Sequence, residues 1–397
     1  MRFVHRIVSL FACLILLWMG ATGAVVESID LVKLVGHAPE TDLTMQSIND
    51  HKFGNNDYAA VTRQDFGAAP LPAGFDYPRA FETLSGALQH AEPGWRPDFV
   101  EVRMANGRPI GQAGKVTLEP FALSVAAAVD LASGAPATPV ALPSPFPPPF
   151  SIRQFIMELH RLWISHDTPG GWFELGTGIL LWVLIVTGLV IYFRLLGLRG
   201  SLRQLRAWFW AGGDWWRVLH RWISVVAAVV LIVVAGTGTY LGFETAWHGL
   251  QPPRRSGAAA PLSAPQITAM ARATAAILQR DAPTTPVRVV RLRVYAGMGQ
   301  GVVLTGEPRM RQLVYDLATG KPQSLNAPGY PASGFPFGMQ AHETMRRIHS
   351  GELFGAPAVF LTDLAGISLA FLSVSGVVVY VSMWSRRARA GRRDLIW

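Results

Sequence analysis

Four long apolar segments divide the chain into membrane-length and mixed-polarity stretches. They cover residues 7–25, 172–193, 217–244 and 357–384. Each holds about 20 nearly uncharged residues, enough helix to cross a bilayer core of roughly 30 Å. The stretches between them, 26–150 and 245–340, mix polar residues with short helix and strand patterns. The pattern predicts an α-helical integral membrane bundle of four spans with two α+β domains outside it.

Finer patterns divide the two mixed stretches in the same way. Each has a helical pattern, at 78–90 and 263–279, followed by strand-like pieces with turn signals. Each then ends in a short amphipathic segment, 151–164 or 341–350, which we expect to be an interfacial helix. Residues 26–70 give no clear pattern.

The first apolar segment has two interpretations. A basic start, a short apolar core and the small residues ATGA are typical of a signal peptide. Its match to the third segment favours a retained transmembrane helix instead. Cleavage would remove His5 from the protein.

Composition excludes several kinds of site. The chain has 397 residues, 50% hydrophobic and 15% charged, and one cysteine, Cys13. A disulfide framework, a cysteine-based zinc site, an iron–sulfur cluster and covalent haem attachment are therefore excluded. The net charge of +9 does not indicate nucleic-acid binding, because the arginines cluster beside apolar helix ends. This positive-inside pattern puts both termini in the cytoplasm and both α+β domains outside, in the periplasm if the membrane is a bacterial inner membrane.

Two halves of the sequence resemble each other. The segment VDLASG at 129–134 recurs as YDLATG at 315–320, and TGLVIY at 187–192 recurs as SGVVVY at 375–380. His5-Arg6 precedes Thr22-Gly23 by 17 residues, as His220-Arg221 precedes Thr237-Gly238. Each half therefore contains a span, an α+β unit, a short helix and a second span. We expect a pseudo-two-fold axis along the membrane normal.

The repeat selects four of the ten histidines. His5 matches His220 and is expected at the cytoplasmic face, whereas His160 matches His349 and is expected at the outer face. Two-fold symmetry would bring each pair together across the axis. Facing imidazoles are suited to axial ligation of haem iron. Snorkelling of single histidines near the headgroups is the alternative, and His342 or His166 could replace an outer ligand.

Small and basic residues accompany the histidines. Thr22-Gly23 and Thr237-Gly238 are expected near the outer pair, and Thr187-Gly188 and Ser375-Gly376 near the inner pair. Glycine there would let a flat ring approach the backbone, although ordinary close packing of membrane helices explains it equally well. Arg6 and Arg221 could pair with haem propionates, but positive-inside anchoring is the simpler explanation. Two histidines per site are too few for zinc without other ligands.

Three segments carry a resemblance to a known family. They are LHRWISVVAAVVLIVVAGTG, ELHRLWISHDTPGGWFELGTGILLWVLIVTGLVIY and RRIHSGELFGAPAVFLTDLAGISLAFLSVSGVVVY. Together with the two units ending VDLASG and YDLATG, they resemble the PepSY-associated transmembrane family. This family includes inner-membrane ferrisiderophore reductases. The first helix departs from the pattern at Ile7, and span four has SG in place of TG. The predicted divisions are a transmembrane helix at 1–25, a first PepSY-like periplasmic domain at 26–150, an interfacial helix and second span at 151–195, a cytoplasmic loop at 196–216, a third span at 217–244, a second PepSY-like periplasmic domain at 245–340, an interfacial helix and fourth span at 341–385, and a cytoplasmic tail at 386–397.

The resemblance implies an oxidoreductase with two haem b groups that passes electrons across the membrane to a ferric siderophore or another Fe(III) chelate. The matching ligands here are His5, His160, His220 and His349. No flavin or nicotinamide motif is present, so a membrane quinol or a cytoplasmic reductase must supply electrons. A transporter component for iron chelates without redox chemistry and a PepSY-type regulatory protein are the alternatives.

Overall fold

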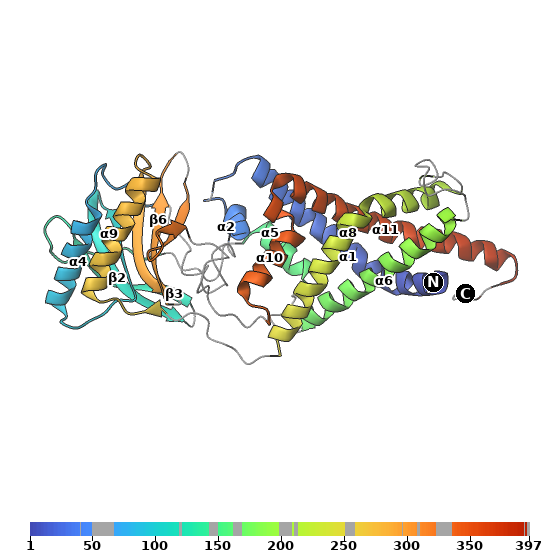
Figure 1. The fold of residues 1–397 in the computed structure, drawn as a ribbon, viewed down its shortest axis with the longest axis horizontal. Coiled ribbons are helices and arrows are strands. Elements are labelled where there is room, and N and C mark those ends of the chain that lie inside the picture. The colour runs from blue at the N-terminus through green and yellow to red at the C-terminus, as the bar shows by residue number, and fades with distance from the viewer. Residues whose placement is uncertain are drawn as a thin grey trace.

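The computed structural model describes residues 1–39, 41–49, 67–118, 121–142, 150–161, 169–197, 209, 213–250, 259–295, 297–307, 310–322, 336–392 and 394. These residues form a helical bundle and a separate β-sheet domain (Figure 1). The N-terminus and the end of the last helix lie at the end of the bundle farthest from the sheet (Figure 1).

Four long helices form the bundle, as the sequence predicts. They are α1 (Arg2–Val35), α6 (Pro169–Gly197), α8 (Trp215–His248) and α11 (Ala356–Arg389). All four are long and apolar enough to cross a membrane. Each extends beyond the predicted span. The largest extension is in α1, which continues to Val35 through a stretch that gives no clear sequence pattern.

The four spans pack closely in two pairs, α1 against α11 and α6 against α8. A Cβ added to Gly20 of α1 would lie 2.8 Å from the backbone nitrogen of Ala370 on α11. A Cβ added to Gly178 of α6 would likewise collide with Thr239 on α8. Small residues thus allow the backbones to approach, as is common between membrane helices.

Shorter helices lie between the bundle and the sheet. They are α2 (Leu43–Asn49), α5 (Ile152–His160), α10 (Met339–His349) and the 3₁₀ turn Glu352–Phe354. α5 begins at Ser151, whose hydroxyl accepts a hydrogen bond from the backbone N–H of Gln154. α5 packs against α1, and α10 packs against α8. Both predicted amphipathic segments therefore contain a helix that ends on a histidine, and residues 162–164 of the first prediction lie outside the described residues.

The two α+β units share one sheet. The strands are β1 (Phe99–Ala105), β2 (Arg108–Leu118), β3 (Phe121–Asp130), β4 (Ala259–Ala260), β5 (Val287–Tyr295), β6 (Met298–Thr305), β7 (Gln312–Asp316) and β8 (Lys321–Pro322). Their order is β3-β2-β1-β5-β6-β7-β8, with β4 beside β5. β1 of the first unit pairs antiparallel with β5 of the second, and Glu101 stands opposite Arg291. The sequence suggests two domains, whereas the structure joins their strands by backbone hydrogen bonds.

The repeated motif DLxxG forms the same turn in both units. The carboxylates of Asp130 and Asp316 accept hydrogen bonds from the backbone N–H groups of Ala132 and Ala318, at 2.9 and 3.0 Å. The motif then closes on a glycine with positive φ. The resemblance between 129–134 and 315–320 therefore reflects a shared local structure after the last main strand of each unit.

The two faces of the sheet differ in chemistry. α4 (Tyr77–Ala91) and α9 (Ala264–Asp281) cover the face turned away from the bundle (Figure 1). Their apolar side chains pack on those of the sheet, with Phe81, Leu84 and Leu292 fully buried. The opposite face carries buried polar residues. There the Arg291 guanidinium donates to Glu101 at 2.8 Å, and Gln112 donates to the same carboxylate at 2.7 Å.

Replacing Glu101 by alanine is expected to destabilise the sheet by about 3–5 kcal/mol, because Arg291 would keep a buried charge without its counter-ion. Thermal unfolding measures this loss. Glu82→Ala is the control, since Glu82 pairs with Arg272 at 3.1 Å on the surface, where both side chains are well exposed. That change should cost less than about 1 kcal/mol. Equal effects of the two substitutions would contradict the expectation.

Candidate haem-ligand site

Each of the four selected histidines is held by a hydroxyl group of a neighbouring span. In every case the imidazole Nδ1 lies within hydrogen-bond distance of a Thr or Ser oxygen. The pairs are His5 with Thr187 at 2.8 Å, His220 with Ser375 at 2.8 Å, His160 with Thr22 at 3.0 Å and His349 with Thr237 at 2.9 Å. The hydroxyls belong to the Thr-Gly and Ser-Gly pairs that the repeat singles out, and each lies beside the histidine pair expected at its depth.

The hydroxyl groups determine which ring nitrogen carries the proton. The Thr22 and Thr237 hydroxyls each donate to the carbonyl four residues earlier, both at 2.7 Å. Thr187 does the same at 2.6 Å, and Ser375 donates to Leu372 at 3.2 Å. A hydroxyl has one hydrogen, so its oxygen is left to accept from the imidazole. This network assigns the proton to Nδ1 and leaves the Nε2 lone pair available to a metal.

A glycine follows each hydroxyl residue and lies against the imidazole. A Cβ added to Gly23 would be 3.2 Å from Cε1 of His160, and one added to Gly238 would be 3.1 Å from Cε1 of His349. The corresponding distances are 3.3 Å from Gly188 to His5 and 3.7 Å from Gly376 to His220. The glycines thus make room for the histidine rings. The sequence had suggested a close approach of the haem or of another helix.

The two outer histidines are close enough to influence each other. Burial, together with weaker charge repulsion from His349 and Arg161, lowers the pKa of His160 to about 3. Burial likewise lowers the pKa of His349 to about 4. Both residues as a whole are half-buried. Both imidazoles are therefore neutral at physiological pH, the form that binds metals.

The inner pair has a similar environment within the bundle. His5 on α1 and His220 on α8 interact electrostatically across the bundle. Arg6 interacts with Tyr380 on α11, and Arg221 interacts with Tyr192 on α6. Each arginine thus interacts with a tyrosine of another long helix. Their pairing with haem propionates stays a prediction.

Other histidines have different roles or positions. The Nδ1 atom of His342 lies 3.0 Å from the buried carboxylate of Glu244, so this nitrogen is already engaged. His166 and His51 lie outside the described residues. Among the residues that the structure describes, no group of three or more His, Cys, Asp and Glu side chains could hold a bare metal ion. The arrangement suits a ligand that needs two histidines, as haem iron does.

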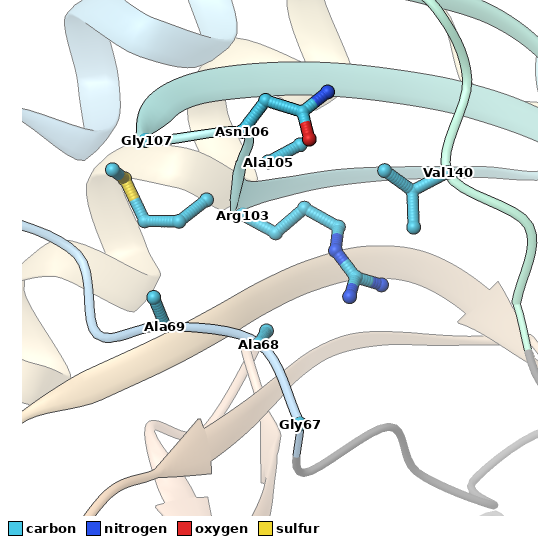
Figure 2. Close-up of a pocket in the computed structure, with 9 residues that line it drawn as sticks. Gly67, Ala68, Ala69, Arg103, Ala105, Asn106, Gly107 and Val140 are labelled. Atoms are coloured by element: carbon cyan, nitrogen blue, oxygen red, sulfur yellow. The ribbon is translucent and has the colours of Figure 1, made fainter.

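The sheet domain contains a cavity of a different kind. It has a volume of about 390 Å³ and lies at the turn Asn106-Gly107. The Arg103 side chain points into it between Ala68 and Val140 (Figure 2). Arg103 also lies 3.6 Å from the Glu101 carboxylate. Its described lining residues include no Ser, Thr, Cys, His, Asp or Glu, so the cavity is a weaker candidate for chemistry than the four histidines.

Sequence reasoning found the histidines but missed what holds them. It attributed the Thr-Gly and Ser-Gly pairs to glycine alone and did not assign a function to the hydroxyls. The signal was present, because a hydroxyl residue precedes the glycine in all four pairs.

Comparison with known proteins gives one family match. The model described as the PepSY-associated TM region matches residues 2–383. A search of curated proteins finds no significant match.

Proposed function

The chain belongs to the PepSY-associated transmembrane family, and we propose that it is a di-haem b protein that passes electrons across a membrane to an Fe(III) chelate. The observation that carries the proposal is the hydrogen bonding of the four imidazoles. In each of them Nδ1 is engaged by a hydroxyl and Nε2 is left for iron. His5 and His220 would hold one haem, and His160 and His349 the other.

A haem between two histidines supplies a one-electron carrier. The residues of the chain hold the ligands in a fixed tautomer and orientation, as second-shell partners of metal-bound histidines do. The pairs are near opposite ends of the same spans, since 17 residues, or about 25 Å of helix, separate His5 from Thr22 on α1. Two haems at this separation would carry electrons through most of the lipid layer.

The arginines at the helix ends predict how the bundle is oriented in the membrane. Arg2 and Arg6 begin α1, and Arg386, Arg387 and Arg389 end α11. By the positive-inside rule this end of the bundle is cytoplasmic, so the sheet domain lies outside, in the periplasm if the membrane is the bacterial inner membrane. The outer pair would then face the chelate, and the inner pair would face the electron donor.

The redox balance requires an external reductant. A membrane quinol releases two electrons and two protons when it becomes a quinone, which matches the one-electron reduction of two Fe(III) centres to Fe(II). A cytoplasmic reductase would serve equally. Reduction weakens the hold of a siderophore on its iron and so releases the metal.

The test uses the full chain purified in detergent. We expect a dithionite-reduced b-type spectrum with about two haems per chain. The reduced protein should be reoxidised by a ferric siderophore, with Fe(II) trapped by a ferrous-specific dye. A colourless, folded protein would refute the proposal and leave a transporter component or a regulatory membrane protein as its function. Two haems that no ferric chelate reoxidises would refute only the assignment of the acceptor.

Replacing Thr237 by valine is expected to weaken binding of the outer haem about 10- to 100-fold, because His349 would lose the acceptor for its Nδ1 proton. Haem titration of the apo-protein measures the change. Thr245→Val is the matched control. Thr245 also lies on α8 and donates to the Leu241 carbonyl at 2.9 Å, so its hydroxyl bonds to the backbone of its own helix. Equal affinities for the two variants would contradict the role of the hydroxyl.

A further inference from the structure

Both short helices that carry the outer histidines are attached to a span at two points. On α5, His160 bonds to Thr22 of α1 at one end. At the other end the Arg153 guanidinium donates to Asp30 of α1 through Nε at 2.6 Å and Nη2 at 2.7 Å. The second attachment depends on the part of α1 that the sequence left unassigned.

The second half has the same arrangement on different residues. On α10, His349 bonds to Thr237 of α8 at 2.9 Å, and His342 bonds to Glu244 of α8 at 3.0 Å. In both helices the second attachment lies seven residues before the ligand histidine. Seven residues are about two turns, so both attachments are on one face of the helix, roughly 10 Å apart. We call Asp30–Arg153 and Glu244–His342 the two anchor pairs.

Two attachments fix the angle between a short helix and its span, which a single attachment would leave free. A helix bonded only at its histidine could pivot about that bond, and the imidazole would turn with it. The anchor pairs remove this freedom from a buried position, since Asp30 is 1% exposed, Arg153 4% and Glu244 0%. Buried polar pairs of this kind, such as the Asp30–Arg153 ion pair, are better suited to fixing one arrangement than to adding net stability.

We propose that Asp30 and Glu244 are positioning residues of the outer site, which fix α5 and α10 through Arg153 and His342 and thereby aim the two outer imidazoles. The proposal rests on the di-haem function. It also assigns His342 to an anchor, where the sequence allowed it as a rival ligand.

The two anchor pairs differ in strength. Arg153 holds both oxygens of Asp30, whereas His342 makes a single bond to Glu244. A bidentate guanidinium–carboxylate pair has greater geometric specificity than a single imidazole contact. This predicts that His342→Arg preserves the anchor of α10, whereas His342→Ala removes it.

The experiment compares Arg153→Ala, Glu244→Ala and His342→Ala with His342→Arg in the full purified chain. Electron paramagnetic resonance and redox titration read the ligand geometry and midpoint potential of each haem, and the inner haem serves as an internal reference. We expect the first three variants to shift or broaden only the outer low-spin signal and to change only the outer potential. His342→Arg should keep the signal of the unmodified chain. Arg272→Ala, which removes the exposed ion pair of the sheet domain, should change neither haem.

Hydrogen–deuterium exchange of the apo-protein gives a readout without haem. Arg153→Ala should speed exchange in residues 152–160, and His342→Ala in residues 339–349, each by about tenfold or more. Unchanged outer signals together with unchanged local exchange would overturn the anchors. An unmodified chain that binds no haem would refute the di-haem function, and the exchange data would still test whether the pairs fix the helices. If Arg153→Ala fails to fold, Arg153→Lys and His342→Ala provide the same test.

Discussion

Replacing His160 by alanine is expected to remove one haem from the purified protein and to leave the other with an unchanged spectrum. His160 is held by Thr22 and interacts with His349, but the inner pair is held by other residues of the bundle. In the proposed di-haem protein His160 and His349 would together hold one haem, so this change would leave that haem with a single protein ligand. Haem content should therefore fall from about two to about one per chain.

The proposed assignment of two histidines to each haem also predicts the effect of double substitutions. The double variant His160→Ala/His349→Ala should lose no more haem than either single change, because both residues serve one site. His160→Ala/His220→Ala should lose both haems. His90→Ala is the control, since His90 is exposed on α4 of the sheet domain and should keep both. Retention of two haems after His160→Ala would break the ligand assignment.

Replacing Gly238 by valine is expected to abolish the outer haem as completely as loss of His349 itself. A Cβ at this position would lie 3.1 Å from Cε1 of His349, and valine adds two further methyl groups. The His349 imidazole could move away from the valine only by losing its hydrogen bond to Thr237. Absorbance and haem content measure the effect, and the inner haem should be unaffected.

A graded series tests the steric cause. Gly176→Val is the matched control, because a Cβ on this glycine of α6 would meet no atom within 4 Å in the described part of the chain. Gly376→Ala should be tolerated, since its Cβ would lie at an ordinary contact distance of 3.7 Å from His220. Loss of haem in Gly176→Val would show that valine harms these helices irrespective of the imidazole.

The sequence predicted much of this arrangement because the relevant signals are periodic or repeated. Runs of about twenty apolar residues predict membrane-length helices. The spacing of His5 to Thr22 and of His220 to Thr237 gives the separation of the two positions along a helix of known rise. The family match supports the four-span membrane fold. The ligand role of the histidines stays a prediction.

Contacts between distant parts of the chain were beyond sequence reasoning. Asp30 and Arg153 are 123 residues apart, and neither belongs to a repeated motif. The pairing of β1 with β5 likewise joins strands about 190 residues apart, and one opposite-charge pair, Glu101 with Arg291, is too short a signal to identify the partner strand from the sequence. The repeat indicated two similar units, but two separate domains and one shared sheet have the same local patterns.

The shared sheet has a consequence for biosynthesis. β1 is made about 190 residues before β5, its partner at the centre of the sheet. At a translation rate of roughly 5–20 residues per second, the nascent first unit waits about 10 to 40 s with an unpaired central strand edge. Such an edge invites pairing with other chains. We therefore expect correct assembly of this protein to depend on how well that edge is kept from other chains until the second unit closes the sheet.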